Sequence, residues 1–415
     1  MSGVWMRGVR ALWTSGATIA LVCGLSVSSW AVYDSGFDPV QSQGAYVAES
    51  GVNNVIQLPD SGVLHYDSFT VPDGVTVIFE KNADNTGVWL LSGGDIIVDG
   101  TINLQGKGGV SKFSVDAIDR AGGYGGPGGS DGGLSIDNGG FGVDGTVAQR
   151  GLGPGGGVLI ETTGAYGASP IFGSNNPDAS SPWAEPGWIP LSGGGGAAAW
   201  ANTSSQVGGG GGGLITMASN GAISVEGKID VSGLGHSGST LGGAGGIRLI
   251  ADTISGSGVL DLSGGTNSSP GYARLEALYF EGQLINNIDP NHYEPILSTP
   301  QVAVPYPEAE RPRLEIATVN GMGPANVRGD WPPNSILTTG VPVEVVVEAE
   351  YMPVGVPGLV VRMNPAGAEP IVIDDAVLEG SVESSSVTVT FALPQGIRVG
   401  TFEAWWVEPM AITNN

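Results

Sequence analysis

One pattern of short strands around a glycine occurs three times in this sequence, at residues 96–106, 223–233 and 254–264. Its shared form is I-x-V-x-G-x-I-D-L-x-G, in which every second residue is apolar or glycine. A period of two is typical of a β-strand that buries one face, and the central glycine marks a bend between two short strands. Such a unit buries its apolar face only by stacking on a copy of itself, so the repeat favours a β-solenoid.

The glycine content of the whole chain agrees with this prediction. There are 72 glycines among 415 residues, and glycine weakens the interior of a helix. The glycines do not follow the Gly-X-Y period of collagen, and an apolar share of 41 % is enough for a buried core. We therefore expect an all-β fold with a right-handed β-helix-like solenoid over residues 32–287. The competing interpretation is a β-sandwich whose strands resemble one another in sequence.

A long glycine-rich insertion, residues 107–213, separates the first two copies of the repeat. It ends in a run of glycines at 208–213. A segment of this composition can be a flexible linker, but aromatic residues are interleaved here, so we expect long loops packed against the solenoid and a short strand at 157–161. Aromatic side chains on loops can stack on sugars or anchor a protein partner, or they can fold back onto the solenoid. The candidate binding residues are Tyr124, Trp183, Trp188 and Trp200.

A proline-rich linker is expected at residues 288–312, and the composition changes after it. Six segments of alternating sequence follow, at 313–319, 341–350, 358–363, 370–373, 386–393 and 400–407. Their number and spacing predict an immunoglobulin-like β-sandwich over residues 313–415. Trp405 and Trp406 are neighbours on the last strand, so one indole is expected in the core and the other on the outside.

The first 31 residues have the organisation of a secretory signal peptide. Arg7 and Arg10 precede a largely apolar stretch at 17–27, and the small residues Ser29 and Ala31 predict cleavage after Ala31. Cleavage would also remove the one cysteine of the chain. We therefore expect an exported protein without a membrane span after signal removal. Its destination is the extracellular space or the cell surface, with the periplasm as the alternative.

The charge of the chain restricts its partners. Fifteen basic and 40 acidic residues give a formal net charge of −25, which argues against nucleic acid and anionic lipid surfaces. Carboxylate and amide oxygens suit Ca²⁺. Five oxygen-bearing residues recur at two positions of the repeat. A sixth lies in residues 139–147, which match the calcium-binding nonapeptide motif in part. These candidate calcium ligands are Asp99, Asn103, Asp144, Glu226, Asp230 and Asp261, and the alternative for them is a solvated face.

The sequence offers no set of residues with the spacing of a catalytic site. The three histidines, His65, His236 and His292, are far apart and lack the spacing of metal ligands, and no G-x-S-x-G occurs. We therefore expect no catalytic residues and no cofactor other than calcium. The alternative is a polysaccharide-active enzyme, a lyase or a hydrolase, that groups acidic residues on a β-helix.

Several stretches resemble a known group of proteins. These are Asp60–Tyr66, Gly93–Ile96, the Gly-Gly-Pro-Gly-Gly stretch at 125–129, Gly264-Gly265 and Ala273–Ala277. They are similar to glycine-rich secreted or surface proteins of Gram-negative and related environmental bacteria, over residues 50–280, and the C-terminal part resembles their immunoglobulin-like ends. The resemblance implies an exported, β-solenoid-like bacterial protein and brings no catalytic residues. We expect a structural or adhesive role at the cell surface or outside the cell, with polysaccharides or surface proteins as partners.

Overall fold

A computed structural model of the chain describes most of residues 33–406. The described residues are 33–82, 84–108, 122–133, 135–137, 146–148, 151, 153, 159–160, 163–164, 194–197, 208–234, 241–264, 270–287, 295–304, 310–323, 336–337, 342–365, 369–392 and 399–406. They contain strands, one short 3-10 helix, η3 (Leu284–Asn287), and no α-helix. The prediction of an all-β fold is confirmed, and most of the strands pair in parallel.

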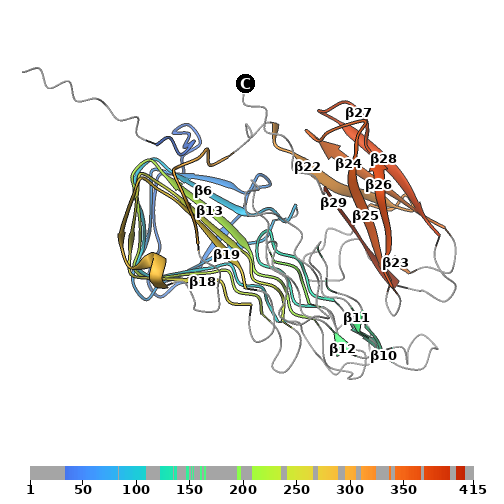
Figure 1. The fold of residues 1–415 in the computed structure, drawn as a ribbon, viewed down its shortest axis with the longest axis horizontal. Coiled ribbons are helices and arrows are strands. Elements are labelled where there is room, and N and C mark those ends of the chain that lie inside the picture. Colours follow the sequence, from blue (N-terminus) through green and yellow to red (C-terminus); the bar gives the residue numbers. More distant parts are fainter. Residues whose placement is uncertain are drawn as a thin grey trace, which may run out of the picture. The chain divides into compact units, whose positions relative to one another are not determined.

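Three parallel sheets contain the repeat (Figure 1). Sheet A has the order β1 (Ala45–Val47), β4 (Ser68–Val71), β7 (Ile96–Val98), β14 (Ala222–Val225), β17 (Thr253–Gly256) and β20 (Tyr279–Gly282). Sheet B has the order β2 (Asn54–Gln57), β5 (Thr76–Glu80), β8 (Thr101–Asn103), β15 (Lys228–Asp230) and β18 (Val259–Asp261). Sheet C has the order β3 (Val63–Tyr66), β6 (Val88–Ser92), β13 (Leu214–Ser219), β16 (Gly246–Ile250), β19 (Tyr272–Glu276) and β21 (Ile296–Ser298).

The chain passes from sheet C to sheet A to sheet B and then begins again, an order compatible with a solenoid. The pairing register places equivalent residues of the three repeat copies on neighbouring strands. In sheet A, for example, Ile96 pairs with Ile223, and Ile223 pairs with Ile254. Their side chains are at most 1 % exposed and belong to one apolar core that all three sheets share. Burial of such side chains contributes about 1.5–3 kcal/mol each and fixes the register.

The bend glycines of the repeat lie one above another, as the sequence predicted. A Cβ atom on Gly227 would lie 1.9 Å from the carbonyl oxygen of Gly100. A Cβ atom on Gly258 would lie 2.3 Å from the carbonyl oxygen of Gly227. Glycine is therefore required because successive turns of backbone approach each other too closely for any side chain.

The glycine-rich segments hydrogen-bond to one another. We call them the glycine layer, and they comprise residues 104–108, 122–133, 194–197, 208–213, 231–234 and 241–245. Within the run 208–213, the N–H groups of Gly208 and Gly211 donate to Gly133 and Ser130, at 2.9 and 2.8 Å. Two other N–H groups of the run, at 210 and 213, donate to the carbonyls of residues 107 and 104. Backbone N–H groups three residues apart therefore donate to the same neighbouring segment. Three residues per turn is the period of an extended polyproline II helix.

Glycine is needed in this layer for space. A Cβ atom on Gly208, Gly211 or Gly212 would lie 1.8–2.0 Å from a backbone oxygen of a neighbouring segment. None of these three glycines has a φ in the left-handed region. We expected loops packed against the solenoid: the described glycine segments contact it, for example through the N–H of Leu214 on the Pro127 carbonyl, and also pack against each other through their backbones. Four short strands also lie in the insertion: β9 (Ser135–Asp137), β10 (Thr146–Ala148), β11 (Leu159–Ile160), which falls in the predicted strand at 157–161, and β12 (Thr163–Gly164).

The C-terminal part forms two antiparallel sheets around a core of its own. One has the order β22 (Arg313–Val319), β24 (Val343–Glu350), β28 (Ser385–Phe391) and β27 (Glu379–Gly380). The other has the order β23 (Ile336–Leu337), β29 (Val399–Trp406), β25 (Pro357–Pro365) and β26 (Ile371–Val377). All six predicted strands are present, and the short β23 and β27 were not predicted. β21 lies inside the predicted linker and completes sheet C.

The two tryptophans of β29 face opposite sides, as expected. Trp406 packs against the apolar core, and Trp405 lies under the guanidinium of Arg362, whose Cζ is 4.7 Å from the ring centroid.

Candidate functional site

The outer faces of the three parallel sheets differ in what covers them. Sheet C is covered by residues 33–43, which we call the strap, and by residues 301–304. The N–H of Ser35 donates to Oδ1 of Asn220 at 2.7 Å, and the N–H of Asp38 donates to Nδ1 of His65 at 3.0 Å. Ala303 of the second segment packs with Trp89 and Ile250 of the sheet in one apolar cluster. This face is closed to a large ligand.

The outer face of sheet B carries the predicted row of oxygen ligands. Asn103, Asp230 and Asp261 are register partners on β8, β15 and β18. Between the two carboxylates lies the ammonium of Lys228, with Nζ 2.6 Å from Oδ2 of Asp230 and 2.6 Å from Oδ2 of Asp261. A cation of the chain itself therefore neutralises part of this row.

Hydrogen bonds satisfy most of the remaining oxygen atoms of the row. Oδ1 of Asp230 accepts bonds from the N–H and the hydroxyl of Ser232, at 3.1 and 2.7 Å. The side-chain amide of Gln105 donates to Oδ2 of Asp230 at 2.8 Å. Burial raises the pKa of Asp261, but hydrogen bonds from Lys228 and Ser263 outweigh it and hold that pKa below its usual value. Burial alone would lower the pKa of Lys228. The hydrogen bonds and charges of Asp230 and Asp261 outweigh burial, so the pKa of Lys228 is raised above its usual value.

The other calcium candidates lie apart from this row. Oε2 of Glu226 accepts bonds from the N–H and the hydroxyl of Ser257, at 3.1 and 2.5 Å. Asp99 follows β7 as Glu226 follows β14, and Asp144 lies outside the described residues. In the part of the chain that the structure describes, no three His, Cys, Asp or Glu side chains are grouped so that they could hold a metal ion. Calcium binding stays a prediction.

Of the four candidate aromatic residues, the structure describes one. Tyr124 lies in the glycine layer, where its carbonyl accepts a hydrogen bond from the N–H of Lys107 at 2.7 Å, and its side chain is half-buried. Trp183, Trp188 and Trp200 lie outside the described residues.

The outer face of sheet A is open and carries small polar side chains. Ser224 and Ser255 are register partners, as are Ala222 and Thr253. Thr70 lies on the same face two strands away. No described residue hydrogen-bonds to the hydroxyl groups of Thr70, Ser224, Thr253 or Ser255. Tyr279 on the edge strand β20 is 62 % exposed. In the pairing register, Ser224 and Ser255 are on neighbouring strands, whereas Ile97 lies between Thr70 and Ser224, so the face carries both hydroxyl and apolar side chains.

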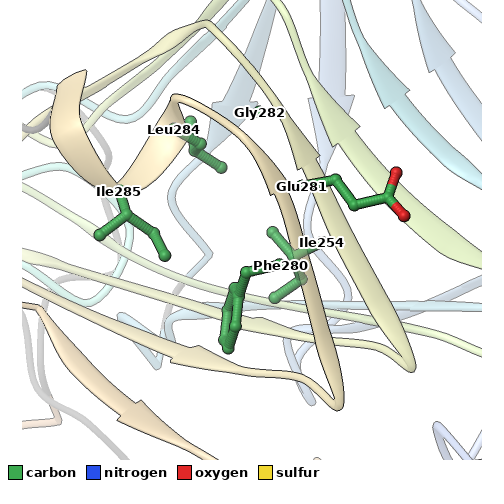
Figure 2. A pocket seen from close by; sticks show the side chains of 6 residues that line it. All are labelled: Ile254, Phe280, Glu281, Gly282, Leu284 and Ile285. Atoms are coloured by element: carbon green, nitrogen blue, oxygen red, sulfur yellow. The ribbon is translucent and has the colours of Figure 1, made fainter.

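A small pocket of about 160 Å³ lies beside η3 (Figure 2). Its walls are Ile254, Phe280, Glu281, Gly282, Leu284 and Ile285. Figure 2 shows the four apolar side chains gathered together, with the Glu281 carboxylate directed away from them. Among the lining residues, Glu281 has the one polar side chain.

Sequence reasoning missed a buried ion cluster on the outer face of sheet C. Arg248 and Glu276 are fully buried, and Arg274 is 9 % exposed. In the sequence, Arg248 is a single charge within the apolar segment 247–250. The signal was the arginine at the same outward position of two neighbouring strands, which the register pairs directly.

Comparison with known proteins identifies no relative. No protein-family model, no curated protein and no solved structure matches this chain. Within the described residues, no helix has the length and apolar character needed to cross a membrane.

Proposed function

We propose that this is a non-catalytic exported bacterial protein with a structural or adhesive role at the cell surface or outside the cell. Its body would be a right-handed β-helix-like solenoid, followed by an immunoglobulin-like β-sandwich. The repeated order of sheets C, A and B and the in-register parallel pairing support the solenoid. Two four-stranded antiparallel sheets around a separate core support the sandwich.

The outer face of sheet A is the observation that carries this proposal. Its hydroxyls have no partner among the described residues, whereas the polar groups of sheet B bond to one another and the outer face of sheet C is covered. Small-molecule active sites are concave and enclose their substrate. A flat sheet face that carries hydroxyl groups and the apolar side chain of Ile97 instead suits an extended polymer or a surface that lies along it.

The charged groups of the solenoid support a non-catalytic role. Lys81 Nζ lies 2.9 Å from Asp131, Lys228 bridges two aspartates, and Arg248 pairs with Glu276. These cations hold other parts of the chain in place and are not free to abstract a proton. Asp95, Glu226 and Glu281 lie on or beside the sheet A face and are exposed, so a neutral polysaccharide suits it better than an anionic one.

Affinity electrophoresis tests the proposal. Residues 32–415 are run through native gels cast with neutral and acidic polysaccharides, with and without Ca²⁺. Retardation by a neutral polymer that stays intact would support an adhesive role. A cleared zone around the band would contradict the non-catalytic assignment and favour the polysaccharide-active enzyme.

A further inference from the structure

Tyr279 carries the one exposed aromatic side chain among the described residues. It is 62 % exposed, whereas every other phenylalanine, tyrosine and tryptophan that the structure describes is buried or half-buried. No described residue hydrogen-bonds to its hydroxyl group. Large aromatic side chains contribute most when they are buried, and tyrosine is enriched where a partner binds. Tyr279 is therefore the strongest candidate for a contact with a ligand from outside the chain.

Four outward-facing residues at the end of sheet A mark the corners of one rectangle of the surface. Tyr279 and Glu281 lie on the edge strand β20, and their register partners Thr253 and Ser255 lie on the neighbouring strand β17. Neighbouring parallel strands are about 4.8 Å apart, and alternate residues along one strand are about 6.6 Å apart. The four positions therefore enclose an area that a single sugar ring can cover.

The polar groups of this rectangle can all bind a ligand. Glu281 is exposed, and Figure 2 shows its carboxylate directed away from the apolar side chains of the pocket beside η3. No described residue bonds to this carboxylate or to the hydroxyls of Thr253 and Ser255. A carboxylate accepts hydrogen bonds with both oxygens, and a serine or threonine hydroxyl donates and accepts. These groups complement the hydroxyls of a sugar, which also donate and accept.

The charge and shape of the surrounding face restrict the ligand. Glu281 is the one charged residue of the rectangle, and the exposed Asp95 and Glu226 beside the face are also acidic. Acidic side chains repel an anionic polymer, so the face favours a neutral one. Beyond the rectangle, the next strand β14 carries Ala222 and Ser224 as the register partners of β17. Their short side chains leave room for an extended ligand that crosses the three strands.

We propose that this end of sheet A binds a neutral polysaccharide of β-linked hexopyranoses with equatorial hydroxyl groups. The inference rests on the proposed function and names the ligand class of the same face. A ring with equatorial hydroxyls has a flat C–H face, which packs on the ring of Tyr279. Its hydroxyls then lie at the rim of the ring, where Glu281 and Ser255 bind them. The β-linkage keeps the polymer extended, so the next rings lie over β14.

Affinity electrophoresis of residues 32–415 at graded polymer concentrations tests this site. Hydroxyethylcellulose, a β-linked glucan, should retard the unchanged protein at lower concentration than soluble starch, whose α-linked chain is coiled. Tyr279→Ala should raise the half-retarding concentration at least about fivefold, whereas Tyr279→Phe keeps the ring and should stay within about twofold. Glu281→Gln removes the carboxylate and should raise it about threefold. Leu297→Ala, at an exposed position on β21 of sheet C, is the control and should change nothing.

The outcomes separate this inference from the proposed function. An unchanged melting midpoint shows that a variant is folded, and Glu281→Gln keeps the test available if Tyr279→Ala is not. Retardation that Tyr279→Ala and Glu281→Gln both leave unaltered would overturn the inference, while the adhesive role would stand. Stronger retardation by starch or by an acidic polysaccharide would overturn the ligand class. No retardation by any polysaccharide would overturn both the inference and the adhesive role.

Discussion

The ammonium of Lys228 lies 2.6 Å from Oδ2 of Asp261, which is on the neighbouring strand of sheet B. The same nitrogen is 2.6 Å from Oδ2 of Asp230, so one lysine joins two successive strands through their carboxylates. Without the lysine, these two carboxylates would repel each other, because they lie on adjacent strands whose backbones are about 4.8 Å apart. Lys228 therefore supplies the positive charge that these two carboxylates share.

Replacing Lys228 with methionine is expected to destabilise the protein by about 1 kcal/mol, because two carboxylates lose their shared partner. The same variant should gain a dependence on calcium, since Ca²⁺ can then bridge Asp230 and Asp261. Thermal unfolding with and without Ca²⁺ measures both effects. Lys228→Met with Asp261→Asn is the control and should lose the calcium response. A calcium response as large in the unchanged protein would show that the lysine does not exclude the ion.

The ion pair also predicts a pH dependence of stability. The pKa of Asp261 is lowered in the folded protein from 3.8, so its contribution is present above that value and is lost as the pH falls through the folded pKa. The pKa of Lys228 is raised from 10.5, so its contribution is present below that value and is lost as the pH rises through the folded pKa.

The free-energy difference between the unchanged protein and Lys228→Met, from urea unfolding, should therefore be constant between about pH 5 and 9. It should shrink at more acidic pH. A difference that grows on acidification would contradict this assignment.

The placement of Asp230 beside Asp261 was predictable, because the repeat alone fixes which residues stack. The role of Lys228 was not, because the equivalent residues are Thr101 and Val259 and the position has no constant character. Arg248 was missed because it is one charge in the apolar strand β16, and Glu276 because it alternates with Arg274 on β19 as an ordinary outward-facing pair would. Two of the partners of Arg248, Val302 and Ala303, lie more than fifty residues away in the sequence, and Gln301, which donates to Glu276, lies 25 residues away.

The glycine layer could not be derived from sequence pattern, because glycine carries no side-chain periodicity. Gly208, for example, bonds to Gly133, and the composition between them is that of a linker. The period of three appears only in the hydrogen bonds. The physical requirement for glycine there is nevertheless simple to test, because it depends on space and not on φ.

Gly211→Ala is expected to destabilise the glycine layer severely. The new Cβ atom would lie 2.0 Å from the carbonyl oxygen of Gly194, and the nearest atoms all belong to backbone, so no flexible side chain can move away. We expect a loss of about 3 kcal/mol or more, in the upper range for overpacking. Gly323→Ala is the matched control, because its nearest atom is a carbonyl oxygen at 3.9 Å, and it should change stability by less than about 0.5 kcal/mol. Urea unfolding measures both variants, and equal stabilities would refute close packing of the layer.

Ser255→Trp is expected to abolish retardation by whichever neutral polysaccharide the unchanged protein binds. The residue lies on β17, between Ser224 on β14 and the edge strand β20, where a bulky ring would interrupt the flat face. Its half-exposed side chain has no partner to lose, so stability should stay within about 0.5 kcal/mol. Thr76→Trp, on the exposed outer face of sheet B, is the control and should leave retardation unchanged. If Thr76→Trp abolishes binding and Ser255→Trp does not, the binding face is sheet B, and the free hydroxyls of sheet A have another role.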